Sequence, residues 1–202
     1  MSVRQRTAQL RRKTKETNIA VKLNLDGQGK AIIETGIPFL NHMLELLTKH
    51  GLFDLAIKAK GDLHVDRHHT NEDVGLLLGE AFKKALGDKR GIRRFGSISL
   101  PMDEAIANVA VDLSGRPKLV FTMAKGSETG SREELGYTLS DAQHFLESFA
   151  NAFGITLHVE TKGGRDLHHI LEAAFKGLGI ALGHAVERNP RIKGVPSTKG
   201  KL

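Results

Sequence analysis

The sequence contains no cysteine, and this absence limits the chemistry open to the protein. Disulfide bonds and thiolate metal sites are excluded, and the composition is compatible with a reducing compartment, so we expect a cytoplasmic protein. No apolar run approaches the length of a membrane span, and the basic segment 1–13 lacks the apolar core of a signal peptide. We therefore expect no membrane partner, and any metal must be held by histidine, aspartate and glutamate.

Aromatic residues are also scarce, since tryptophan is absent and there is one tyrosine in 202 residues. Platforms for stacking nucleic-acid bases are therefore few, although phenylalanine and arginine can substitute. The formal net charge is +7 and the pI is near 9.7. Such a charge indicates an anionic partner, either nucleic acid or a small phosphorylated molecule. The composition favours the small molecule, so we expect a small phosphorylated partner and no nucleic-acid partner.

The sequence consists of two similar halves. The segment "LDGQGK" (25–30) recurs as "LSGRPK" (113–118), and the amphipathic segment 41–51 recurs as 143–154. Alternating apolar and polar residues before each glycine-containing turn indicate strands, and we expect each turn to join a hairpin. Each half is predicted to run strand–strand–helix–strand–helix, with a further strand at its start.

The repeat also predicts the domain organisation. Residues 1–88 and 89–190 form two half-domains of one compact, pseudo-symmetric unit. The second half carries an insertion, 124–141, which is polar and rich in glycine and serine, and we expect it to be a loop. The tail, 191–202, has no periodicity and is predicted to be either disordered or a binding arm.

The most specific motif, HHxxE, occurs at residues 68–72 and again 100 positions later at 168–172. Residues four apart on a helix share a face, so the first histidine and the glutamate of each motif can chelate one ion. The second histidine of each motif lies about 100° round the helix from the first. Two further histidines, His42 and His144, occupy matching positions of the two halves at an offset of 102 residues. The candidate metal ligands are therefore His42, His68, His69, Glu72, His144, His168, His169 and Glu172.

A single pair of adjacent histidines is commonly solvated or part of a helix cap, but such a role does not explain recurrence at matched offsets. Imidazole and carboxylate ligands without thiolate suit Mn, Fe, Co, Ni or Zn. The symmetric division of the ligands gives each of two ions three histidines and one glutamate. One set is His68, Glu72, His144 and His169, and the other is His42, His69, His168 and Glu172.

Seven segments carry a resemblance to a known family: "ETNIAVKLNLDGQG", "TGIPFLNHML", "DRHHTNEDVG", "RRFGSISLPMDEA", "VDLSGRPKLVF", "HHILEAAFKGLG" and "PSTKGK". Together they resemble imidazoleglycerol-phosphate dehydratase, over nearly the whole chain. The resemblance implies an α+β fold, a two-layer α/β sandwich of tandem half-domains, each with a four-stranded sheet and two helices. It also implies a homo-oligomer of 24 copies with two Mn²⁺ ions per chain at subunit interfaces.

The resemblance assigns roles to further residues. It implies that Glu16, Asp103 and Glu172 are catalytic, and that the tail 191–202 is an arm that orders over the substrate. The phosphate-binding residues that it implies are Arg94, Arg116, Lys176, Ser197 and Lys199.

The implied reaction is the dehydration of D-erythro-imidazoleglycerol phosphate to imidazole-acetol phosphate in histidine biosynthesis. The C–H bond that breaks is not acidic, because no carbonyl group lies beside it. Divalent ions on the ring nitrogens would stabilise an imidazolate that expels the hydroxyl group and gives a diazafulvene. Nearby carboxylates or metal-bound water would move the protons. Two alternatives are a non-catalytic RNA-binding protein with a ribosomal-protein-like α/β fold, and a different metal-dependent hydrolase.

Overall fold

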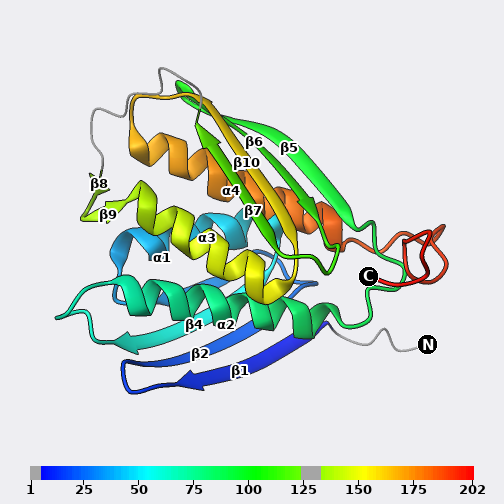
Figure 1. The fold of residues 1–202 in the computed structure, drawn as a ribbon, viewed down its shortest axis with the longest axis horizontal. Coiled ribbons are helices and arrows are strands. Elements are labelled where there is room, and N and C mark those ends of the chain that lie inside the picture. Colours follow the sequence, from blue (N-terminus) through cyan, green and yellow to red (C-terminus); the bar gives the residue numbers. More distant parts are fainter. Residues whose placement is uncertain (1–5, 124–132) are drawn as a thin grey trace.

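The computed structural model describes residues 6–123 and 133–202. Two four-stranded sheets form the outer layers, and the long helices of both halves lie between them (Figure 1). The fold is therefore α+β, built from a duplicated unit of one sheet and two helices, as the sequence predicts. None of the helices in these residues is long and apolar enough to cross a membrane.

The first half forms one sheet with the strand order β1-β2-β4-β3. β3 and β4 are parallel and are joined by α1, whereas the other neighbouring strands are antiparallel. The elements are β1 (Thr7–Lys13), β2 (Thr17–Asn24), β3 (Ala31–Glu34), α1 (Pro38–Gly51), β4 (Asp54–Gly61) and α2 (His68–Leu86).

The second half repeats this arrangement in the strand order β5-β6-β10-β7. A separate pair of two-residue strands, β8 and β9, precedes its first helix. The elements are β5 (Phe95–Met102), β6 (Ala105–Asp112), β7 (Lys118–Met123), β8 (Glu133–Glu134), β9 (Tyr137–Thr138), α3 (Leu139–Phe153), β10 (Thr156–Gly163) and α4 (Leu167–Val186).

Local sequence explains these elements. In β2, Ile19, Val21 and Leu23 are buried on the inner face and alternate with more exposed residues, as in a strand with one face on the core. Helix α3 begins with a capping box, in which Thr138 and Asp141 each satisfy the other's backbone N–H.

Glycines let helices of opposite halves approach closely, α2 against α3 and α1 against α4. A Cβ atom at Gly79 of α2 would lie 2.6 Å from the Phe149 carbonyl oxygen, and one at Gly179 of α4 would lie 2.4 Å from the Leu47 carbonyl oxygen. Both contacts are too short for any side chain, so glycine is required. These two glycines are 100 positions apart, as are the HHxxE motifs, and the close crossings bring ligands on different helices together.

The predicted order of strands and helices is confirmed in both halves, but two details are wrong. The turns at 25–30 and 113–118 do not join hairpins, because β4 lies between β2 and β3, and β10 lies between β6 and β7. The paired strands are joined instead by the turns between β1 and β2 and between β5 and β6.

The insertion at 124–141 is not wholly a loop. Residues 124–132 lie outside the described residues, but 133–138 form β8 and β9, and α3 already begins at Leu139. The side chain of Tyr137 is fully buried, and its hydroxyl donates a hydrogen bond to Asn71 of α2 at 2.8 Å. An apolar ring in a polar segment therefore fixes this part of the insertion against the helices.

Candidate metal centres and phosphate-binding residues

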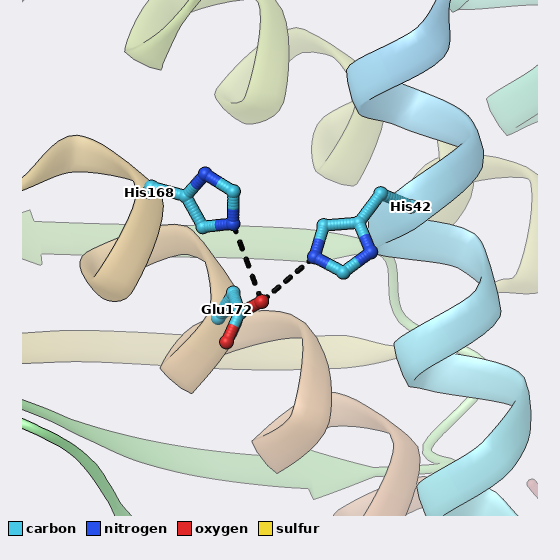
Figure 2. A group of neighbouring side chains, drawn as sticks. All are labelled: His42, His168 and Glu172. Carbon is cyan, nitrogen blue, oxygen red and sulfur yellow. Dashed lines mark hydrogen bonds and ion pairs between the residues drawn. The ribbon is translucent and has the colours of Figure 1, made fainter.

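The first cluster, which we call cluster 1, joins α1 to the start of α4. His168 and Glu172 lie four residues apart on α4 and face His42 of α1 (Figure 2). Glu172 Oε1 is 2.7 Å from His42 Nε2 and 3.3 Å from His168 Nε2. The candidate ligand atoms all lie within 4.8 Å of one another, so one cation can contact all three residues.

Glu172 is ionised in this position by its neighbours. Burial disfavours its charged form, but hydrogen bonds from Lys176 and His42 outweigh burial and lower the pKa of Glu172 to about 2. Lys176 Nζ donates to Glu172 Oε2 at 2.7 Å and contacts Met102 Sδ at 3.2 Å. The lysine therefore holds one carboxylate oxygen, and the other oxygen faces the two imidazoles.

The second cluster, cluster 2, joins the start of α2 to α3. His68 Nε2 lies 4.0 Å from Glu72 Oε2, and the rings of His68 and His144 are stacked with centroids 4.3 Å apart. The ligand atoms of these three residues again lie within 4.8 Å of one another. The side chain of Glu72 is 41% exposed, compared with 9% for Glu172.

The second histidine of each HHxxE motif lies outside both clusters. His69 Nδ1 is 3.0 Å from Asp62 Oδ2, and His169 Nδ1 is 2.8 Å from Glu104 Oε2. Each hydrogen bond raises the pKa of its histidine. Both side chains are partly exposed, and a carboxylate on Nδ1 leaves Nε2 as the nitrogen available to a metal, the usual arrangement behind a metal-ligating histidine. We call His69 and His169 the outward histidines.

Two of the three acids predicted to be catalytic lie beside these outward histidines. Glu16, in the turn between β1 and β2, has Oε2 3.9 Å from His69 Nδ1. Asp103, in the turn between β5 and β6, has Oδ2 3.5 Å from His169 Nε2. The repeat thus places an exposed carboxylate next to the second histidine in both halves. The third, Glu172, lies in cluster 1.

The residues predicted to bind phosphate separate into two groups. Lys176 belongs to cluster 1, whereas Arg94 donates through Nη1 to the Pro196 carbonyl at 2.9 Å and so contacts the tail that carries Ser197 and Lys199. Arg116 is 68% exposed and has Nη2 3.6 Å from Asp112 Oδ2, the carboxylate that also binds Arg94.

These groups lie at opposite ends of the molecule. β5 runs from Phe95, beside Arg94, to Met102, which contacts Lys176. The seven residue steps from Phe95 to Met102 span roughly 24 Å at about 3.4 Å per residue. The N-terminal ends of α2 and α4 lie at one end of the molecule and the C-terminal tail lies at the other (Figure 1).

The donor set fits a divalent transition metal. Both clusters combine two imidazoles with a carboxylate and contain no thiolate, as Mn²⁺, Fe²⁺ or Zn²⁺ sites do. His144 Nδ1 is buried and has no hydrogen-bond partner among the described residues, although buried polar atoms are usually paired. A cation bound in cluster 2 would supply a partner for an imidazole nitrogen there.

A family model described as Imidazoleglycerol-phosphate dehydratase matches residues 35–182. The chain belongs to this family. Imidazoleglycerol-phosphate dehydratase of Methylorubrum populi is 54% identical over 199 residues, covering 98% of this chain and 100% of that protein. The chloroplastic enzyme of Pisum sativum is 50% identical over 198 residues, covering 98% of this chain and 69% of that protein.

Solved structures agree with this assignment. The crystal structure of IGPD from Pyrococcus furiosus has a TM-score of 0.80 and 38% sequence identity, covering 96% of this chain and 100% of that one. The imidazoleglycerol-phosphate dehydratase structure from Staphylococcus aureus has a TM-score of 0.78 and 33% identity, covering 91% and 99%. The chain is therefore a hydro-lyase of histidine biosynthesis.

The structure adds residues that sequence reasoning did not single out. Asp62 binds His69, Glu134 has Oε1 3.7 Å from His168 Nδ1, and Asp112 binds Arg94. Asp62 has no acidic counterpart in the second half and Glu134 lies in the insertion, so no spacing pointed to them. Asp112 lies four residues before Arg116 in "VDLSGR", a proximity that the sequence does contain.

Proposed function

We propose that this chain dehydrates imidazoleglycerol phosphate in a metal-dependent reaction, with two Mn²⁺ ions bound per chain. The observation that carries the proposal is the pair of clusters, each made of two imidazoles and one carboxylate from two adjacent helices. The symmetric pairing of His42 with His168 and of His144 with His68 is the one expected from the repeat.

We further propose that neighbouring subunits complete the sites. Each cluster has three ligand residues, and the partly exposed side chains of His69 and His169 each have a carboxylate behind Nδ1. An outward histidine from another copy would supply a fourth ligand. Arg94 and the tail lie a strand's length from the clusters of their own chain. They would therefore bind the phosphate of a substrate held at a cluster of another copy. These arguments favour a homo-oligomer, for which we propose the 24-copy shell.

The side chains divide the chemistry between them. Bound divalent ions would supply Lewis-acid stabilisation of the deprotonated imidazole ring of the substrate. Glu16 and Asp103, both exposed and beside outward histidines, would transfer protons on the glycerol chain. Glu172 would serve both as a ligand and as an acceptor near the ring. Arg94, Arg116, Lys176, Ser197 and Lys199 would hold the phosphate, with 191–202 as the arm over the substrate.

We propose the cytoplasm as the location, because of the absence of cysteine.

The experiment combines three measurements on one preparation of the full chain. They are turnover of imidazoleglycerol phosphate, elemental analysis of the protein, and the mass of the particle in solution. We expect turnover that EDTA abolishes and Mn²⁺ restores, about two ions per chain, and a large homo-oligomer. Activity that survives complete metal removal would refute the metal-dependent mechanism. Tight, salt-sensitive RNA binding without turnover would favour the RNA-binding alternative.

A further inference from the structure

Asp112, at the end of β6, contacts both of the arginines that are predicted to bind phosphate. Its Oδ1 accepts from Arg94 Nε at 2.7 Å and its Oδ2 accepts from Arg94 Nη2 at 3.1 Å, which makes the pair bidentate. Arg116 Nη2 approaches the same Oδ2 at 3.6 Å. The side chains of Arg94 and Asp112 are 15% and 20% exposed, so water screens this pair less than a fully exposed one.

The backbone of Arg94 is constrained in an unusual conformation. Its φ is +74°, in the left-handed region, which is unfavourable for a residue with a Cβ. The backbone N–H of Arg94 donates to the Ala185 carbonyl and its carbonyl accepts from Leu113, so α4 and the end of β6 hold this conformation. The guanidinium also lies 4.5 Å from the centre of the Phe95 ring. Both the backbone and the side chain of Arg94 are thus held by neighbouring residues.

Arg94 in turn holds the tail. Its third nitrogen, Nη1, donates to the Pro196 carbonyl, immediately before Ser197. The tail also contacts the segment before β5, through the hydrogen bond from Gly91 N–H to the Gly194 carbonyl. A continuous chain of contacts therefore links Asp112 to Arg94 and Arg94 to the residues that precede Ser197 and Lys199.

We propose that Asp112 is a positioning residue for phosphate binding, which fixes Arg94, aligns Arg116 beside it and through Arg94 places the tail carrying Ser197 and Lys199. The proposal rests on the proposed function, because these four residues are taken to bind the substrate phosphate. Asp112 itself would not touch the phosphate, since both are anionic.

This role predicts an effect opposite to that of simple electrostatics. Removal of a negative charge near a phosphate site should strengthen phosphate binding if the summed field alone decides affinity. Removal of a positioning group should weaken binding, because the arginines and the tail lose their arrangement. The sign of the change in KM therefore separates the two explanations.

The test compares the full-length, metal-loaded protein with Asp112→Asn, Asp112→Glu, Arg94→Lys and Glu160→Gln. Glu160→Gln is the matched control, because it removes a carboxylate from the same sheet, where Glu160 binds Asn108 rather than an arginine. For Asp112→Asn we expect a KM raised about tenfold with kcat changed less than twofold, the pattern of lost binding common to ground and transition states. Inorganic phosphate should inhibit this variant at roughly tenfold higher concentration, Asp112→Glu should recover part of the loss, and Glu160→Gln should match the parent.

Limited trypsin digestion, followed by intact mass, provides a readout that needs no turnover. We expect faster cleavage after Lys193 and Lys199 in both Asp112→Asn and Arg94→Lys, and no change in Glu160→Gln. An unchanged or lowered KM in Asp112→Asn, or equal cleavage rates in all proteins, would overturn the proposal. If the parent protein does not turn over imidazoleglycerol phosphate, the proposed function is refuted. The digestion would still decide whether Asp112 and Arg94 hold the tail.

Discussion

Clusters 1 and 2 contain equivalent residues in equivalent places of the repeat, yet their surroundings differ. In cluster 1, Glu172 lies within hydrogen-bonding distance of His42, His168 and Lys176. In cluster 2, Glu72 is more exposed, and its nearest approach to His68 is 4.0 Å. The position that corresponds to Lys176 is occupied by Leu76, so cluster 2 lacks the cation that holds the carboxylate in cluster 1.

The comparison shows how a duplicated ligand set can be supported in two different ways. Lys176 fixes Glu172 with one oxygen toward the imidazoles even in the metal-free chain, which is a pre-organised arrangement. In cluster 2 the corresponding residue, Leu76, cannot bind a carboxylate, so Glu72 must be oriented by a bound ion or by solvent. We therefore expect the clusters to differ in stability and in metal affinity although their ligands are equivalent.

The largest effect is expected for Glu16, which tests whether the acids beside the outward histidines do chemistry. Glu16→Gln keeps size and hydrogen bonding but removes the ionisable group, so turnover should fall about 10²- to 10⁴-fold, the usual range for a positioned acid or base. Metal content and particle mass should stay unchanged. The measurement is kcat beside elemental analysis. Near-parental kcat would make Asp103, the exposed acid beside His169, the better candidate.

The next effect concerns the clusters themselves. His168→Ala and His68→Ala each remove one direct ligand, and we expect metal affinity at the altered cluster to fall by at least about 100-fold, because loss of even outer-shell partners costs roughly 10- to 100-fold. Each variant should retain the ion of the other cluster. Titration of the EDTA-treated protein with Mn²⁺ measures both sites. Loss of both ions from each single variant would show that the clusters do not bind independently.

Comparison of the repeats shows why part of the site was predictable. Matched offsets identified the histidines of both clusters, because helices of similar length carry them and the glycines at 79 and 179 set similar crossings. Strand pairing was not predictable from the turns at 25–30 and 113–118, since β4 and β10 arrive later in the sequence and insert between the strands on either side. The contact between Arg94 and Pro196 was equally hidden, because it joins residues 102 positions apart that no repeat relates.

A smaller effect is expected for the stability of the metal-free chain. Glu172→Gln leaves Lys176 largely buried without its counter-ion, and breaking a buried pair costs about 3 kcal/mol. Glu72→Gln changes an exposed residue and should cost less than about 0.5 kcal/mol. Urea unfolding in the presence of EDTA compares the two variants. Equal losses would mean that the difference in surroundings has no energetic consequence.

The smallest effect is the dependence of this stability on pH. The pKa of Glu172 is about 2 in the folded chain, below its ordinary value of 4.5, so the folded state binds its proton less readily than the unfolded state does. The stabilisation is fully present above pH 4.5 and is lost as pH falls from there toward 2. At pH 3.5 the loss should be about 1 kcal/mol relative to pH 6.

Glu172→Gln isolates this contribution, because glutamine does not titrate. We expect the free energy of unfolding of the metal-free parent to fall more steeply between pH 6 and 3.5 than that of Glu172→Gln. Other carboxylates with lowered pKa, such as Glu104, contribute equally to both proteins and cancel in the difference. Urea unfolding at several pH values provides the measurement. Parallel curves for the parent and Glu172→Gln would mean that Glu172 is not preferentially ionised in the folded chain, and cluster 1 would then be no better prepared for a cation than cluster 2.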